Sequence, residues 1–94
     1  MTVDYHERDL SPEGHEIHRA LASLIEELEA IDWYTQRIDV TGDEELESIL
    51  THNRDEEVEH AAMTLEWLRR KLKPFDEELR TYLFSSGSIT KIEG

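Results

Sequence analysis

The stretch LESILTHNRDEEVEHAAMTLEW, residues 46–67, decides the fold. Its heptad positions are apolar near the ends and polar in the middle: Leu46, Leu50, Asn53, Glu57, His60, Thr64 and Trp67. Glu57 and His60 form a Glu-x-x-His pair, whose spacing places a carboxylate and an imidazole on one helical face, one turn apart. A glutamate on a face that packs against another helix is disfavoured by desolvation unless a cation compensates its charge. Packing alone therefore does not explain why Glu57 and His60 stand on this face.

A second apolar stripe precedes this stretch and predicts a helix over about residues 12–40. Ser11 can cap that helix, and Pro12 suits its first turn. The stripe follows a spacing of four, three, four and three residues: Ile17, Leu21, Leu24, Leu28 and Ile31. Gly42 permits a tight turn, and Thr41 with Glu44 has the spacing of a capping box for a helix over about residues 43–72. Because the connection is short, the two helices should form an antiparallel hairpin.

Lys73 and Pro74 should end the second helix, since proline lacks the backbone N–H. A short third helix is expected over about residues 75–84, followed by a loop and a short tail. The fold class is thus all-α: an antiparallel two-helix hairpin plus a short C-terminal helix, in one domain over residues 1–94 with flexible ends. We expect this hairpin to dimerise into a ferritin-like four-helix bundle.

Composition narrows the classes of function. The chain has 94 residues and a formal net charge of −13, which argues against nucleic acid and favours cations as ligands. It contains no cysteine, so disulfides, thiolate zinc sites and cysteine nucleophiles are excluded. No stretch has the length of a membrane span, and the N-terminus does not have the pattern of a signal peptide. We therefore expect a soluble cytoplasmic protein without a membrane partner.

The hairpin geometry predicts which residues meet the Glu-x-x-His pair. Glu27 and Glu57 each lie fifteen residues from Gly42. At 1.5 Å per residue both lie roughly 22 Å from the turn, so Glu27, Glu57 and His60 can converge. Ferritin-like di-iron sites take a glutamate from each of two helices and a Glu-x-x-His pair from each of two others. One chain carries half of that set, and a two-fold homodimer would complete it with iron or manganese.

Two other classes of function stay open on the residues alone. Acidic helices produce Glu-x-x-His by chance, so the chain could be a non-catalytic acidic helical module that directs assembly. Alternatively, it could be a metal-dependent enzyme of the rubrerythrin or hydroxylase type. Such an enzyme needs an added redox centre or a substrate cavity, and a chain of 94 residues without cysteine leaves little room for either.

Three stretches closely resemble the encapsulated ferritins, two-helix proteins packaged inside encapsulin nanocompartments: LIEELEAIDWY at residues 24–34, HNRDEEVEHAAMTLEWLRR at 52–70 and RTYLF at 80–84. The resemblance implies a ferroxidase that binds two Fe(II) ions between paired chains and oxidises them with dioxygen. It also implies that the ferric product is stored as mineral inside the encapsulin shell. It further implies that dimers of the chain assemble into a ring, which makes a decamer.

The resemblance also assigns residues. The iron ligands fall on Glu27, Glu57 and His60, the same three residues that the hairpin arithmetic selects. Glu26 and Glu29 match a metal-uptake site of the family, which would also take Ca²⁺ or other divalent cations. Trp33 matches a tryptophan close to that site, and Tyr34 matches a tyrosine beside the di-iron centre. Encapsulin cargo usually carries a short targeting peptide rich in Leu, Gly and Ser, and residues 85–94 do not resemble one. The peptide was either removed from this sequence or lies elsewhere.

Overall fold

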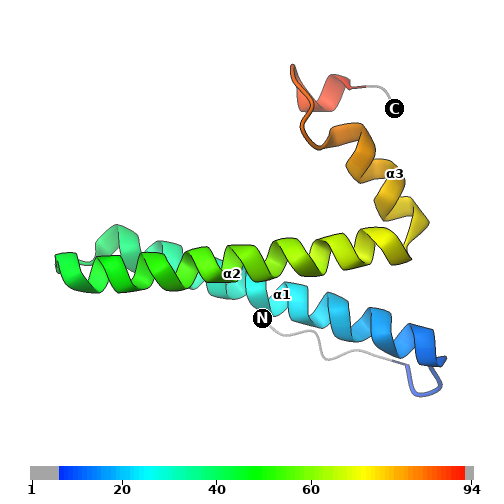
Figure 1. The fold of residues 1–94 in the computed structure, drawn as a ribbon, viewed down its shortest axis with the longest axis horizontal. Coiled ribbons are helices and arrows are strands. Elements are labelled where there is room, and N and C mark those ends of the chain that lie inside the picture. The colour runs from blue at the N-terminus through cyan, green and yellow to red at the C-terminus, as the bar shows by residue number, and fades with distance from the viewer. Residues whose placement is uncertain (1–6, 93–94) are drawn as a thin grey trace.

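The structure is a computed structural model that describes residues 7–92, and all regular secondary structure within that range is helical. The helices are α1 (Pro12–Val40), α2 (Glu44–Lys71), α3 (Lys73–Tyr82) and the 3-10 helix η1 (Ile89–Lys91). Helices α1 and α2 run antiparallel as a long hairpin, and α3 leaves the end of α2 at a steep angle (Figure 1). The predicted hairpin with a short C-terminal helix is therefore confirmed. Of the ends expected to be flexible, residues 1–6 and 93–94 lie outside the described range.

The start of α1 forms as predicted, whereas the cap of α2 does not. The Ser11 hydroxyl accepts a hydrogen bond from the Gly14 N–H at 3.0 Å. The cap of α2 is Asp43, whose carboxylate accepts from the Leu46 N–H at 2.8 Å, so the expected Thr41–Glu44 capping box is wrong. Asp43 immediately precedes the helix and reaches its third N–H, while Thr41 ends α1 and accepts from the Asp43 N–H at 3.3 Å.

The turn does not need the conformational freedom of glycine. Among the described glycines only Gly87 has a positive φ, at 84°, and a Cβ placed on Gly42 would meet no atom within 4 Å. Two extended residues, Thr41 and Asp43, reverse the chain instead, with φ of −69° and −103°. Other small residues should therefore be tolerated at position 42.

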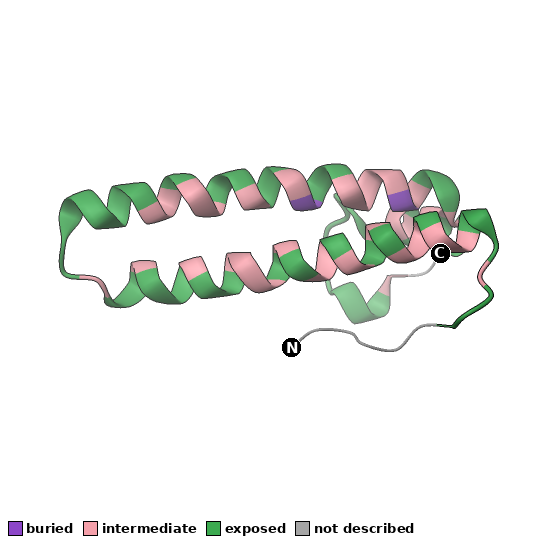
Figure 2. Ribbon diagram, turned by 90° about the horizontal axis from the view of Figure 1, so that it is seen from below, coloured by how far each residue is buried: buried purple, intermediate pink, exposed green. Residues whose placement is uncertain are grey.

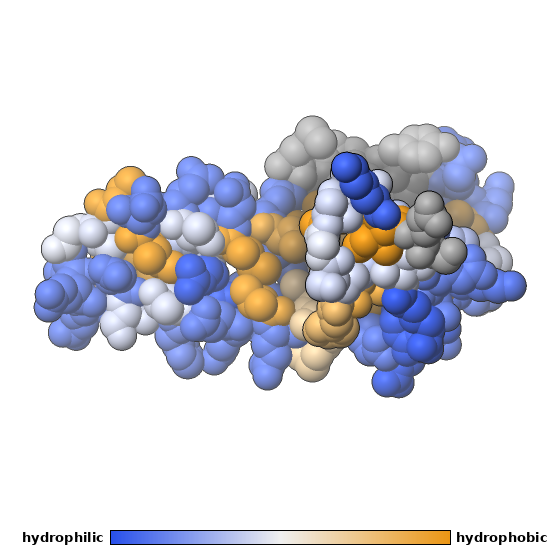
Figure 3. All heavy atoms as spheres, turned by 90° about the horizontal axis from the view of Figure 1, so that it is seen from above, coloured by the Kyte–Doolittle hydropathy of each residue, from blue (hydrophilic) through white to orange (hydrophobic). Residues whose placement is uncertain are grey.

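The hairpin buries very little by itself. Among the described hydrophobic residues only Ala61 and Leu68 are buried, and both lie on α2 (Figure 2). The predicted stripe on α1 is only partly covered by α2, since Leu28 remains 53% exposed and Leu21 36%. Figure 3 shows hydrophobic patches still open between hydrophilic side chains along one long face. One hairpin thus leaves much of its apolar surface in water.

Helix α3 begins and ends two residues earlier than the predicted range 75–84. Pro74 lies in its first turn, where the missing N–H has no helical partner to lose, so the helix starts before the proline rather than after it. Phe84 has a φ of 62°, a left-handed conformation that cannot continue a helix. No helix within residues 7–92 is long and apolar enough to cross a membrane.

Candidate metal site

The three predicted ligands lie around one hollow between α1 and α2, and we call it the ligand hollow. It has a volume of about 380 Å³ and is lined by six residues: Ser23, Glu26, Glu27, Ala30, Glu57 and His60. Four come from α1 and two from α2, as expected for a site midway along an antiparallel hairpin. The helix geometry therefore brings Glu27 to the same hollow as the Glu-x-x-His pair.

Within this hollow, Glu57 and His60 are neighbours on one face of α2. The Nδ1 atom of His60 lies 3.9 Å from Oε2 of Glu57, which is too long for a hydrogen bond. The His60 side chain is 44% exposed and that of Glu57 29%, so both can still be reached from outside. The His60 backbone is part of a regular helix, and its carbonyl also accepts a hydrogen bond from the Thr64 hydroxyl at 3.1 Å.

The Glu27 side chain leaves one polar atom of the ligand hollow unsatisfied. Its Oε1 atom is buried and has no hydrogen-bond partner in the structure. A buried polar atom without a partner is costly, and native proteins rarely retain one without a reason. A cation bound in the hollow would supply the missing interaction. Carboxylate oxygens with an imidazole nitrogen are a donor set that suits iron or manganese.

One chain does not assemble a complete metal site. Within residues 7–92, no group of three or more His, Asp or Glu side chains lies close enough together to hold an ion. Glu27, Glu57 and His60 therefore share a hollow without forming a preformed cage. Further ligands, from a second chain or from movement of these side chains, are needed to bind a metal.

The other predicted site residues are divided between the ligand hollow and its surroundings. Glu26 is exposed and lines the ligand hollow itself. Glu29 is half-buried and Trp33 is 53% exposed, and neither is a lining residue of the hollow. Tyr34 is half-buried, and the guanidinium carbon of Arg37 lies 5.7 Å from the centre of its ring. The predicted uptake pair is thus split between the hollow and its surroundings.

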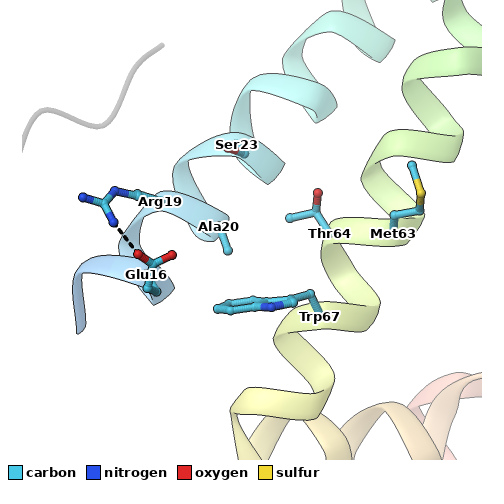
Figure 4. Close-up of a pocket in the computed structure, with 7 residues that line it drawn as sticks. All are labelled: Glu16, Arg19, Ala20, Ser23, Met63, Thr64 and Trp67. Atoms are coloured by element: carbon cyan, nitrogen blue, oxygen red, sulfur yellow. Dashed lines mark hydrogen bonds and ion pairs between the residues drawn. The ribbon is translucent and has the colours of Figure 1, made fainter. Parts of the chain in front are cut away.

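Two lining residues were not predicted from the sequence, Ser23 and Ala30. They flank Glu27 at four residues before and three after, a spacing that puts all three on one helix face and that could have identified them. Ser23 also lines a neighbouring hollow of about 400 Å³, which Figure 4 shows between α1 and α2. There the Trp67 ring extends from α2 toward Ala20 on α1, and an ion pair joins Arg19 and Glu16. The two hollows therefore continue along one side of the hairpin.

Comparison with known proteins identifies the family. A family model described as EncFtn-like matches residues 3–86. The chain is also 66% identical over 76 residues to "Encapsulated ferritin-like protein" of Rhodospirillum rubrum, which covers 81% of this chain. The chain belongs to the encapsulated ferritins. It spans about half of that relative, 54% of its length.

Two further relatives of this encapsulated ferritin extend the comparison over nearly the whole chain. "Ferritin-like protein" of Thermotoga maritima is 55% identical over 95 residues, which cover 99% of this chain and 83% of that protein. The crystal structure of protein ne0167 from Nitrosomonas europaea has a TM-score of 0.89 and 54% identity, covering 93% of this chain and 98% of the other. A shorter match, 45% identical over 56 residues, is to "Encapsulin nanocompartment cargo protein EncC" of Myxococcus xanthus; it covers 58% of this chain and 43% of that protein.

Proposed function

We propose that this encapsulated ferritin is a ferroxidase whose di-iron site forms between two copies of the chain. Two hairpins pack with their ligand hollows facing each other about a two-fold axis, and each copy contributes Glu27, Glu57 and His60. The dimer binds two Fe(II) ions as substrate, and dioxygen takes up the electrons that they lose. Paired hairpins also form the four-helix bundle that ferritin-like sites require.

The observation that carries the proposal is the buried, unpartnered Oε1 atom of Glu27, beside Glu57 and His60 in one hollow. A single chain offers too few ligands, and symmetry doubles each of them. The exposed apolar residues on the hairpin support pairing, because a second copy would remove them from water. Met63, which is 60% exposed, lies beside the hollow of Trp67 on this side of α2.

The chemistry follows from the charges that pairing brings together. Two copies of Glu27 and Glu57 place four carboxylates close to one another, and these repel until cations neutralise them. Carboxylates can bridge two ions and hold them near each other, so that one oxidant molecule can take an electron from both. The His60 of each copy supplies one ring nitrogen to one ion, and a hydrogen bond from its other ring N–H can fix the orientation of the imidazole.

Residues outside the ligand set would serve delivery and assembly. Glu26 lies at the hollow and, with Glu29, would attract hydrated Fe(II) or Ca²⁺ near Trp33 before the ion reaches the site. Tyr34, held under Arg37, would stand beside the paired ions. The name of the Myxococcus relative supports an encapsulin shell as partner. We propose in addition that the dimers form a ring-shaped decamer and that the ferric product is stored within the shell.

The decisive experiment is an anaerobic Fe(II) titration of metal-free protein followed by air, with ferric absorbance and particle mass recorded. We expect saturation near one iron per chain, rapid oxidation and larger particles once iron binds. Glu57→Ala should lose all three. The matched control is Glu56→Ala, which removes the neighbouring carboxylate that pairs with His52 Nε2 at 2.9 Å outside the hollow, and it should behave as the parent does.

Two outcomes would contradict the proposal. If neither parent nor Glu57→Ala binds iron in a fixed ratio, the chain is a helical assembly module whose acidic pair is structural. If Glu56→Ala loses iron as fully as Glu57→Ala, diffuse negative charge rather than the ligand hollow collects the metal. Replacing Fe(II) by Zn²⁺ or Ca²⁺ in the same titration then separates binding from oxidation.

A further inference from the structure

The junction between α2 and α3 turns on a single extended residue. Leu72 lies between the two helices, as the C-cap of α2 and the N-cap of α3, with φ of −116° and ψ of 107°. The inner side of this elbow is not filled by side chains, since a hollow of about 450 Å³ lies between the two helices. Glu66 and Arg69 line it from α2 and Leu79 and Arg80 from α3, while Leu83 and Phe84 line it from the segment that follows α3. Apolar packing therefore does not close the inner angle.

Charged residues cross this junction in a continuous chain of ion pairs. Arg69 binds Glu66 through two nitrogens, at 2.7 and 2.9 Å, and its third nitrogen donates to Asp76 on α3. Asp76 also accepts from Arg80 Nε at 2.8 Å, and Glu66 accepts from Arg70 Nε at 2.8 Å. Arg69 alone in this chain of pairs joins α2 to α3. Its side chain is 24% exposed and that of Asp76 31%, so water screens the pair less than a fully exposed one.

The positions of these charges also suit the helix ends. Arg69 lies in the last turn of α2, and Asp76 lies in the first turn of α3, whose N-cap residue makes no side-chain hydrogen bond. A cation at a helix C-terminus and an anion at a helix N-terminus are both stabilised by the helix dipole. The planar guanidinium is needed because it can serve two carboxylates at fixed angles, which an ammonium group cannot.

We propose that Arg69 is an ionic latch that holds α3 at a fixed angle to the hairpin. The latch makes α3 a rigid arm that holds the exposed residues at and just beyond its end, Tyr82, Leu83 and Phe84, in a defined position, rather than a helix on a free hinge at Leu72. This device is independent of iron, because none of its members lines the ligand hollow.

A distance measurement between α2 and α3 tests the latch. The chain has no cysteine, so Ser48→Cys and Glu78→Cys, both at exposed positions, can be spin-labelled selectively. Labelled chain is diluted with an excess of unlabelled chain, so that the distance is measured within one subunit. We expect one narrow distance peak in the parent. Arg69→Met, Arg69→Lys and Asp76→Asn should lose it and give a broad distribution.

The matched control is Arg70→Met, which removes a cation bound to the same Glu66 but makes no contact with Asp76 in the ion-pair chain. It should keep the narrow peak. The proposal is overturned if Arg69→Met and Asp76→Asn keep that peak, because packing around Leu68 would then set the angle. It is also overturned if Arg70→Met broadens the peak as much, or if circular dichroism shows that Asp76→Asn unfolds α3 instead of releasing it.

Discussion

The ligand hollow and the elbow at Leu72 use the same acidic side chains in opposite ways. At the elbow, Glu66 and Asp76 each accept hydrogen bonds from two arginines. In the ligand hollow, Glu27 has a buried oxygen with no partner, and Glu57 has only an imidazole 3.9 Å away. The elbow is electrostatically complete within one chain, whereas the hollow is not.

Under the proposed function, this difference marks the place where the chain depends on a cation and a second copy. The elbow carboxylates Glu66 and Asp76 are paired with arginines of the same chain and need no further cation. The unpartnered oxygen of Glu27 would gain an interaction from a bound cation, as the proposed function requires. The predictions below test whether the two regions differ in this way.

The largest expected effect is that of Glu27→Gln, which keeps the side chain's shape and removes its charge. Because the proposed dimer is two-fold symmetric, the substitution removes two iron ligands at once. The rate of iron oxidation should therefore fall by more than about 100-fold, which exceeds the loss usual for residues that only support a metal ligand. Metal-free protein should lose no thermal stability, because a buried charge without a partner has been neutralised. Stopped-flow ferric absorbance and thermal unfolding measure both effects. A variant that oxidises iron at the parental rate would refute the assignment of Glu27.

Removing metal should weaken association of the chains. Four carboxylates face one another in the proposed dimer, so metal binding and pairing are linked. Chelation should shift the particle mass toward smaller species, and Fe(II) should reverse the shift; sedimentation velocity measures both. His60→Ala provides the comparison, since its mass should respond to neither treatment. Equal masses with and without metal in the parent would show that apolar contacts alone hold the chains together.

Leu68→Ala tests the packing beside the elbow. Leu68 is fully buried, and truncation of such a leucine costs about 2–5 kcal/mol of unfolding free energy. Leu46→Ala, at a position that is 44% exposed, should cost less than half as much by the same denaturant titration. Equal losses would mean that association buries Leu46 as deeply as the single hairpin buries Leu68.

Regular helix geometry explains how much could be predicted from the sequence. The rise per residue is constant along a helix, so counting from the turn was enough to bring Glu27 to the hollow of Glu57 and His60. The heptad pattern could not show that Leu28 stays exposed, because an apolar stripe looks the same whether it packs against a helix of its own chain or against a second copy. The hydrogen bond from Arg69 to Asp76 could not be predicted, because it crosses the non-helical residue Leu72. Beyond that residue, spacing along the sequence no longer shows which way a side chain points.

Glu26→Gln should have a smaller effect than loss of a ligand. Glu26 is exposed at the rim of the hollow, so its charge should raise the local concentration of Fe(II) without holding the oxidised pair. We expect slower oxidation at low iron, a normal rate at saturating iron and unchanged iron stoichiometry. Rates measured over a series of iron concentrations, at low and high salt, check this. If Glu26→Gln loses bound iron as fully as Glu57→Ala, the separation of uptake from oxidation is wrong.

The smallest expected effect concerns acid and the elbow. Hydrogen bonds from Arg69 and then Arg70 lower the pKa of Glu66 from 4.5 to about 2. On α3, partial burial acts to raise the pKa of Asp76, but hydrogen bonds from Arg80 and Arg69 together outweigh it and hold that pKa below its ordinary value. A depressed pKa means that the folded state binds the proton less tightly than the unfolded chain. The stabilisation by Glu66 is therefore complete above pH 4.5 and is lost as the pH falls toward about 2.

The difference in melting temperature between the parent and Glu66→Gln measures this stabilisation at each pH. It should stay constant from about pH 7 to pH 5 and shrink only below that range, because Glu66 remains ionised in the folded chain. Glu47→Gln, in the first turn of α2 and outside the ion-pair chain, serves as the control for loss of one exposed carboxylate. A difference that already shrinks between pH 7 and pH 5 would mean that the arginines do not hold Glu66 as tightly as the elbow geometry requires, and the contrast between the elbow and the ligand hollow would lose its basis.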